Sequence, residues 1–433
     1  MVSRPILKKK NNLKKYILYF FILMAWLPIS YALDQISSNP AAVNITPGTG
    51  ALQHYLESNY SIHFDDGIQF DGAWLGDAND LFSGGIPNPE RWTSNSLLLL
   101  DTNVDTEKLL GWQGGLFDVQ FLQFDGRPTN AQAGTVQGYN SLPGQPPLDR
   151  SELYQLWYRQ ALFNQKLFIR IGKVVPTFDF NNVIKPVPLQ GDNIPAVTGL
   201  IYTPIFVNPS MLGVLPGYYN SAYGITANIV PTKRWYLSLG SYDGNLAQGV
   251  QTGLTGPHFN GAYFNIGETG LSWLLGRDRM PGTIGLGGWH QTGLIQTTPS
   301  FSEHGASGYY LFGSQRLWYK KPGIDNSGIS GFYQYGFNNS SVLSMTRYVG
   351  GGLTAFGLIP SRLKDFMGIG AAYSWLNQTS FSRKTELMLQ AYYQAKVNDI
   401  VYLEPVLSYI PTPGATSNLS AAWAGTLRAI VLF

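Results

Sequence analysis

Side chains that can bind a polar solute occur at alternating positions of several short segments. They are three arginines, two glutamates and two aromatic residues, namely Arg159, Arg170, Arg428, Glu386, Glu404, Trp157 and Tyr392. An arginine presents a planar fork of donors that fits two neighbouring hydroxyl groups, and a carboxylate accepts hydrogen bonds from such a pair. An aromatic face packs against C–H groups. Together these groups could hold an uncharged, hydroxyl-rich solute, provided that the fold brings them to one surface.

The segments that carry these residues alternate in polarity with a period of two. In the last segment Leu427, Ala429 and Val431 share one face, whereas Thr426 and Arg428 lie on the other. Such alternation predicts β-strands with one apolar and one polar face. The same pattern occurs in residues 153–160, 167–173, 386–394 and 400–409.

The composition of the 433 residues is poor in charge and rich in aromatic residues and glycine. Charged residues make up 13% of the chain and aromatic residues 14%, with 49 glycines and no cysteine. This aromatic and apolar content argues against disorder, and a disulfide scaffold is excluded. The body of the chain lacks a basic block, so we expect no nucleic acid partner. No histidine spacing typical of a metal site occurs, and we expect neither a metal nor a cofactor.

The N-terminus has the pattern of a secretory signal. Six basic residues precede the apolar run 16–29, and Ala32 ends a short cleavage-like site. We therefore expect residues 1–32 to be a cleaved signal peptide. Their removal takes away no acidic residue and changes the formal net charge from +3 to −3. Residues 33–59 are interpreted as a periplasmic leader with one short helix at 51–59, and residues 60–433 as one β domain.

A transmembrane β-barrel explains these features together. No stretch after the signal approaches 18 consecutive apolar residues, so we expect no transmembrane helix. Without helices, only a closed barrel can pair every backbone polar group inside a bilayer. The final strand alternates over ten residues and ends on Phe433, like the C-terminal signal of outer-membrane proteins. The length predicts an antiparallel barrel of about 16 strands.

Several stretches, in order, resemble the carbohydrate-selective porin family (OprB type) of Gram-negative outer membranes. The resemblance extends from about Gly50 to Phe433, and its most specific part is Gly350–Asp365. The family pattern often has an acid where Arg159 stands, a departure that bears on the choice of solute. The other matching stretches are Leu153–Gln160, Phe168–Lys173, Gly267–Gly270, Gly285–Trp289, Gly308–Gln315, Tyr392–Gly414 and Gly425–Phe433.

This resemblance implies a barrel with short periplasmic turns and longer outer loops, some folded inward to constrict the pore. It implies a channel, not an enzyme, for passive, sugar-preferring diffusion of small carbohydrates such as monosaccharides. Implied partners are outer-membrane lipid, lipopolysaccharide and the barrel-assembly machinery, which would read Phe433. The implied location is the outer membrane of a Gram-negative bacterium.

Within such a pore, the seven residues named first become candidate constriction residues. Arg159 and Arg170 fall on consecutive strands of one hairpin, and the last three strands supply Glu386, Glu404 and Arg428. Trp157 and Tyr392 would stack on the sugar ring. The alternative is that lumen arginines and glutamates only pair with one another and brace the wall. For Arg362 and Asp365 we prefer a structural role in an inter-strand turn.

Four other functions remain open. An anion-preferring porin would need a ladder of basic residues, against which Glu268, Glu386 and Glu404 argue; a general porin would select by size alone. A barrel enzyme would need a nucleophile motif such as G-x-S-x-G, which the sequence lacks. A plugged structural barrel would need inward loops, for which the proline-rich stretches 128–147 and 176–216 are long enough.

Overall fold

The computed structural model describes most of the chain after residue 66. The described residues are 57, 67–142, 144, 149–183, 208–215, 220–244, 256–259, 261–298 and 301–433, with the backbone alone at 296–298 and 301. The expected signal peptide and, apart from Glu57, the expected leader and its helix lie outside them. None of the helices in the described part is long and apolar enough to cross a membrane.

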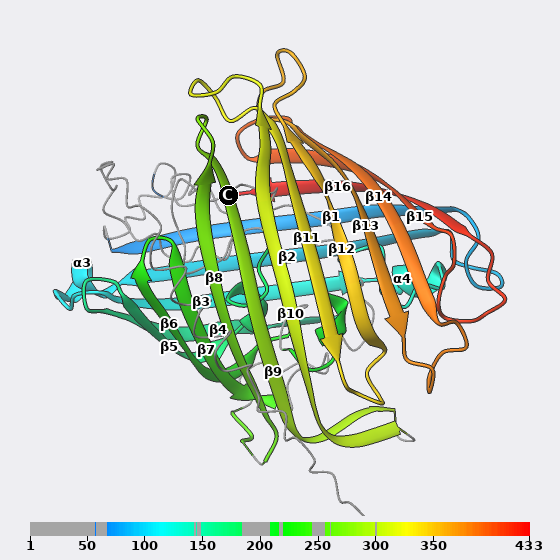
Figure 1. Ribbon diagram of the computed structural model, residues 1–433, viewed down its shortest axis with the longest axis horizontal. Helices are drawn as coiled ribbons and strands as arrows, with labels where there is room; N and C mark the ends of the chain where they lie inside the picture. Colours follow the sequence, from blue (N-terminus) through cyan, green and yellow to red (C-terminus); the bar gives the residue numbers. More distant parts are fainter. Residues whose placement is uncertain are drawn as a thin grey trace, which may run out of the picture. The chain divides into compact units, whose positions relative to one another are not determined.

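Sixteen antiparallel strands form one closed barrel, as the sequence predicts (Figure 1). Each strand pairs with its two neighbours in the chain, and β1 pairs with β16. The strands are β1 (Ile68–Ser83), β2 (Trp92–Asp105), β3 (Gly115–Gly126), β4 (Arg150–Leu162), β5 (Leu167–Val174), β6 (Ala222–Thr232), β7 (Trp235–Asp243), β8 (Tyr263–Leu275), β9 (Met280–Thr298), β10 (Phe301–Tyr319), β11 (Gly328–Asn338), β12 (Met345–Phe356), β13 (Phe366–Leu376), β14 (Thr385–Lys396), β15 (Val401–Ile410) and β16 (Ala422–Leu432).

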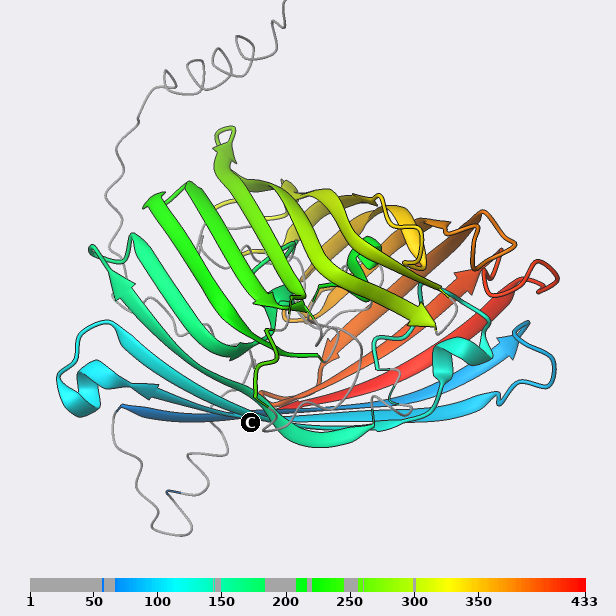
Figure 2. The ribbon, with the colours of Figure 1, turned by 90° about the horizontal axis from the view of Figure 1, so that it is seen from below.

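The barrel closes where the first strand meets the last, seen as the blue and red ribbons side by side in Figure 2. Cα partners across this seam run from Ala73 and Leu432 to Ser83 and Trp423. The backbone of Phe433 exchanges two hydrogen bonds with Gly72, of 2.6 and 2.8 Å. Closure removes the free sheet edges, which is a requirement in a bilayer.

Alternation along the strands sorts the side chains as predicted. In β3, Phe117, Val119 and Phe121 are exposed on the outer face, whereas Asp118 and Gln120 are buried on the inner face. In β16, Leu427 is exposed and Arg428 is buried. The apolar face therefore points outward to lipid and the polar face inward.

The connections differ in length at the two barrel ends. The connections 163–166, 233–234, 276–279 and 397–400, each of two to four residues, lie at the end where β1 begins and β16 finishes. Short turns of this kind face the periplasm in bacterial barrels. One periplasmic connection holds α3 (Thr106–Leu110), which is capped by Asp105. The opposite end carries the long connections 127–149, 175–221 and 244–262.

The described parts of two long outer connections fold into the barrel, as the proline-rich stretches predict. They contain α4 (Thr129–Gln132) and the 3-10 turns η1 (Pro176–Phe178) and η2 (Pro209–Met211). Apolar residues from them make a hydrophobic core inside the barrel, against inward aromatic residues of the wall. Its members include Phe180, Met211, Val214, Leu215, Tyr242, Phe264, Tyr310 and Phe312.

Glycines in the wall make room for this inner core. Gly285 and Gly287 of β9 lie directly opposite Phe312 and Tyr310 of β10. A Cβ added at Gly287 would lie 2.2 Å from the Tyr310 ring. The aromatic rings can thus lie flat against the wall and leave depth for the inward connections.

Candidate functional site

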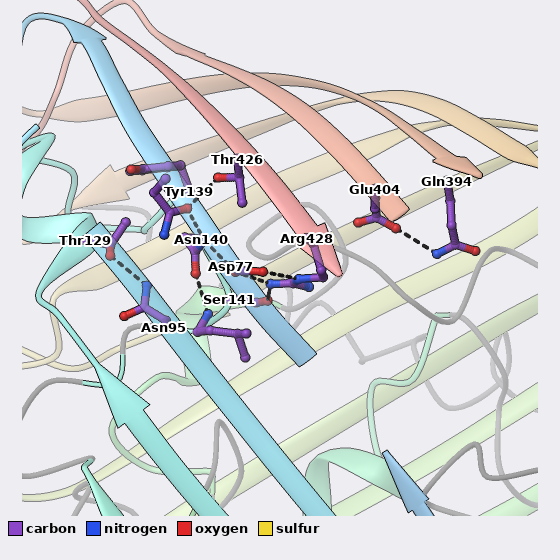
Figure 3. A network of polar contacts seen from close by, with 12 residues as sticks. Asp77, Asn95, Thr129, Tyr139, Asn140, Ser141, Gln394, Glu404, Thr426 and Arg428 are labelled. Carbon is purple, nitrogen blue, oxygen red and sulfur yellow. Dashed lines mark hydrogen bonds and ion pairs between the residues drawn. The ribbon is translucent and has the colours of Figure 1, made fainter. Parts of the chain in front are cut away.

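One inward connection, residues 127–142, lies against the wall on both sides of the barrel seam; we call it the first strap. At its start, the Thr129 hydroxyl lies 2.8 Å from that of Thr93 and accepts a 2.7 Å hydrogen bond from Asn95. Near its end, the Asn140 amide donates to Asp77 and to Asn79, each at 2.8 Å. These contacts fix both ends of the strap to β1 and β2 (Figure 3).

Arg428 takes part in the same network. Its guanidinium donates to both carboxylate oxygens of Asp77, at 2.7 and 2.8 Å, and to Ser141 of the first strap at 2.7 Å. Asp77 and Arg428 are also cross-strand partners at the seam. Figure 3 shows the guanidinium pointing toward Asp77 and Ser141. Arg428, which the sequence predicts to donate hydrogen bonds to a sugar, therefore joins the seam to the first strap.

Glu386, near the outer end of β14, holds the middle of the first strap. Its carboxylate accepts hydrogen bonds from the Thr135 hydroxyl (2.6 Å) and from the backbone N–H groups of Val136 (2.9 Å) and Gln137 (3.0 Å). A fourth comes from the backbone of Gly414 at 2.5 Å. Four donors satisfy both oxygens of this buried carboxylate. Its chemistry in the structure is that of a loop anchor.

Glu404 and Tyr392 lie on the same part of the wall. Glu404 of β15 is the cross-strand partner of Arg428 and accepts a 2.7 Å hydrogen bond from Gln394 (Figure 3). Its Oε1 is buried and has no hydrogen-bond partner among the described residues. The Tyr392 hydroxyl lies 3.3 Å from that of Thr354. The structure thus places Glu404 beside Arg428 on neighbouring strands. Glu386 lies apart from them, near the outer end of β14.

A second inward segment, residues 175–183, crosses from β5 toward β11; we call it the second strap. Asp179, which follows η1, forms a buried ion pair with Arg170 of β5. Two residues on, the Asn181 side chain donates to Gln334 of β11 at 3.1 Å. The strap is therefore attached to two separate parts of the wall.

Glu268 of β8 holds the second strap between these points. Its carboxylate accepts the Asn181 backbone N–H at 2.6 Å and the hydroxyls of Tyr236 and Tyr310 at 2.5 and 2.8 Å. Glu268 belongs to a stretch that matches the family pattern, yet its partner in the strap lies 87 residues away in the sequence. Like Glu386, Glu268 is a buried carboxylate whose oxygens accept hydrogen bonds from other groups of the protein.

The β4–β5 hairpin brings three predicted residues together. Arg159 and Arg170 are direct cross-strand partners, with inward-facing side chains. The Arg170 guanidinium lies 5.1 Å from the centre of the Trp157 ring, and that of Arg159 lies 5.5 Å from the Phe168 ring. Arg159 keeps 9% of its surface exposed, and its Nε has no hydrogen-bond partner among the described residues.

Two aspartates complete this cluster, and the sequence did not identify them as site residues. Asp101 of β2 and Asp118 of β3 are fully buried on the inner wall and lie close to each other, and Asp118 also interacts with both arginines. Asp118 has no hydrogen-bond partner among the described residues apart from Asp101, and two buried carboxyl groups in contact cannot both carry a charge. The alternation of β3 indicated an inward Asp118, but only strand pairing places it beside Arg159.

Arg362 and Asp365 lie in the periplasmic turn between β12 and β13. Asp365 accepts hydrogen bonds from the Arg362 guanidinium (2.7 Å), the Lys396 backbone (3.0 Å) and the Tyr393 hydroxyl. Burial by itself would raise the pKa of Asp365, but the hydrogen bonds outweigh it and lower this pKa below its usual value. These contacts agree with the structural role expected for the pair.

Replacing Asp365 by asparagine should make the folded barrel less stable at neutral pH. The lowered pKa means that the folded state favours the ionised carboxylate, so its contribution is present above about pH 3.9, the usual pKa. It is lost as the pH falls through the lowered pKa. We expect D365N to unfold about 2–4 °C below the parent at pH 7 and to show a smaller gap at pH 3, by heat-modified gel mobility. An equal gap at both pH values would contradict this.

Comparisons with known proteins agree with this geometry. The sequence profile described as carbohydrate-selective porin, OprB family, matches residues 94–433. Porin B of Pseudomonas aeruginosa is 22% identical over 423 residues, which cover 85% of this chain and 88% of that protein.

Solved structures show the same fold. A high-pH structure of Pseudomonas putida OprB matches 89% of this chain and 97% of its own, at 18% identity and a TM-score of 0.74. A low-pH structure of the same protein matches 90% of this chain and 99% of its own, at 17% identity and a TM-score of 0.54. Because the family profile spans most of the barrel, the chain belongs to the OprB family of carbohydrate-selective porins, channel proteins of the Gram-negative outer membrane.

Proposed function

We propose that this porin passes small neutral carbohydrates of monosaccharide size, and that the β2–β5 cluster makes the selective contact. The cluster consists of Asp101, Asp118, Trp157, Arg159 and Arg170. The observation that carries the proposal is a set of buried donors and acceptors without partners side by side on the inner wall. Asp118 offers an acceptor oxygen beyond its contact with Asp101, and the Nε of Arg159 is a free donor, among the described residues.

The chemistry of the cluster fits a vicinal diol. A hydroxyl group both donates and accepts, so one hydroxyl can donate to Asp118 while its neighbour accepts from Arg159. Leaving these groups unpaired costs roughly 1–3 kcal/mol each, so a solute that pairs them is favoured over one that cannot. Trp157, stacked under Arg170, presents an indole at the same place. Binding must remain weak, because the solute also has to leave.

The other candidate residues are proposed to act mainly through the straps. Glu386 and Arg428 direct their polar atoms to the first strap and the seam. Because they hold the strap in place, Glu386 and Arg428 would shape the aperture, and their effect on sugars would be indirect. We propose Glu404 and Tyr392 as secondary contacts, because Oε1 of Glu404 has no hydrogen-bond partner among the described residues and Tyr392 lies near it.

Export, assembly and lipid contacts are proposed from the sequence pattern. Residues 1–32 would be removed on export, residues 33–59 would form a periplasmic leader, and residues 60–433 would form the barrel domain. Phe433 would be read by the assembly machinery. Outward aromatic residues, such as Tyr409 and Trp423 stacked at 4.3 Å, would contact lipid and lipopolysaccharide at the membrane interface.

Liposome swelling tests the proposed function. Purified, refolded protein is compared for glucose, a disaccharide, an uncharged polyol of glucose size and a zwitterionic amino acid. We expect glucose to enter well ahead of the size-matched solutes. Equal entry of all small solutes would reduce the barrel to a size filter, and no swelling with intact heat-modifiable folding would favour a plugged barrel.

A further inference from the structure

We propose that Asp179 of the second strap sets the preference of this pore for neutral solutes over anions. The inference rests on the proposed function, since it concerns the selectivity of the same cluster. It identifies a specificity residue outside the barrel wall. The wall alone carries an excess of positive charge at this point, and a loop residue cancels it.

The positive charge comes from two arginines in direct opposition. Arg159 and Arg170 are cross-strand partners, and both are buried. Like charges directly opposite on a sheet face repel each other. Buried cations also lose hydration and need compensating charge nearby. Two uncompensated guanidinium groups in a narrow lumen would concentrate anions there, because low-dielectric walls focus the field.

Two carboxylates face this pair, and they come from different parts of the fold. Asp118 is on the wall strand β3 and interacts with both arginines. Asp179 is on the second strap and forms an ion pair with Arg170. Asp101 and Asp118 lie in hydrogen-bond contact, and two buried carboxyl groups this close carry one negative charge between them, so the wall cannot neutralise two arginines. The charge that balances Arg170 is therefore supplied by the strap.

The strap holds Asp179 at a defined position. On one side it follows the short turn η1, and on the other it precedes Phe180, whose ring packs edge-on against Tyr242 at 6.5 Å. Asn181 then bonds to Glu268 and Gln334. The contacts of the strap with the opposite wall thus fix the position of Asp179, and its carboxylate stays beside Arg170.

Ion selectivity measures this charge balance without any sugar. Reversal potentials across planar bilayers, recorded in a KCl gradient, give the ratio of chloride to potassium permeability. We expect D179N to raise this ratio about five-fold, the scale of one unit charge acting over several ångströms in a partly aqueous lumen. R170Q should lower the ratio by a similar factor, because it leaves Asp179 uncompensated, and D179E should resemble the parent.

Two control variants separate charge from other causes. D399N removes an acidic group whose side chain is 90% exposed in a periplasmic turn, and it should leave the ratio unchanged. D179E keeps the charge and changes only the length of the side chain. The proposal is overturned if folded D179N matches D399N, or if D179E shifts the ratio as much as D179N does. Failure of the proposed function would appear separately, as absence of glucose preference in swelling by the parent protein.

Discussion

Replacing Glu386 by alanine should at least double the single-channel conductance and let larger sugars through. The carboxylate accepts four hydrogen bonds, three from the first strap and one from Gly414. Hydrogen bonds to a charged group contribute about 1.5–3 kcal/mol each, so E386A removes the strongest hold on the middle of the strap. Bilayer recordings in KCl and swelling with glucose and a disaccharide measure the result.

Only part of the first strap should be released. Thr129 and Asn140 still attach its ends to β1 and β2, so the segment around Thr135 would move while the ends stay in place. We therefore expect a wider aperture in an intact barrel, seen as unchanged heat-modifiable mobility. E386Q keeps one acceptor oxygen and should have an intermediate effect.

Glu404 provides the matched control. It is another buried lumen glutamate, on the neighbouring strand, and its described hydrogen bond goes to Gln394 of the wall. E404Q should leave the conductance within the range of the parent. If E386A behaves like E404Q, the first strap does not define the aperture.

The fold could be predicted from local pattern because a barrel strand is specified locally. Alternation assigned Asp118, Arg170 and Arg428 to the inner face, and the structure places all three there. Strand number followed from chain length, and inward loops followed from proline-rich stretches. Each of these inferences needs only residues near one another in the sequence or a count over the whole chain.

The partners of the inward side chains could not be predicted in the same way. Glu386 meets Thr135 across 251 residues, and Arg428 meets Asp77 across 351. These contacts depend on where a loop turns inside the barrel and on the register at the seam, which no local pattern specifies. The sequence therefore identified groups able to bind sugar without revealing that several are occupied by the protein itself.

The same limitation explains why Asp101 and Asp118 were missed. Each is an ordinary inward polar residue of its own strand. Their proximity follows from the pairing of Asn103 with Asp118 and of Asp101 with Gln120, and their approach to Arg159 from the next pairing along the sheet. A site spread over four strands is visible only when the register is known.

Replacing Arg159 by lysine should weaken glucose binding in the pore about two- to ten-fold while leaving ion selectivity close to that of the parent. Lysine keeps the charge but loses the planar fork that matches two hydroxyl groups. Because lysine can still donate one hydrogen bond, the net loss is about 0.5–1.5 kcal/mol, which corresponds to roughly a two- to ten-fold change in affinity. Sugar-induced reduction of ion current, titrated with glucose, gives the binding constant.

Arg316 of β10 is the control for this last experiment, because it is also buried, inward and stacked on aromatic rings. Its guanidinium lies 5.0 Å from the Tyr319 ring and 4.7 Å from the Phe356 ring, but its cross-strand neighbour on β11 is Ser330 instead of a charged residue. R316K should leave glucose binding unchanged. If R159K and R316K weaken binding equally, the arginines act through general packing, and if neither does, the sugar contact lies away from the β2–β5 cluster. A selective effect of R159K would mean that a fork of donors beside a free carboxylate is what distinguishes a sugar from other solutes of its size.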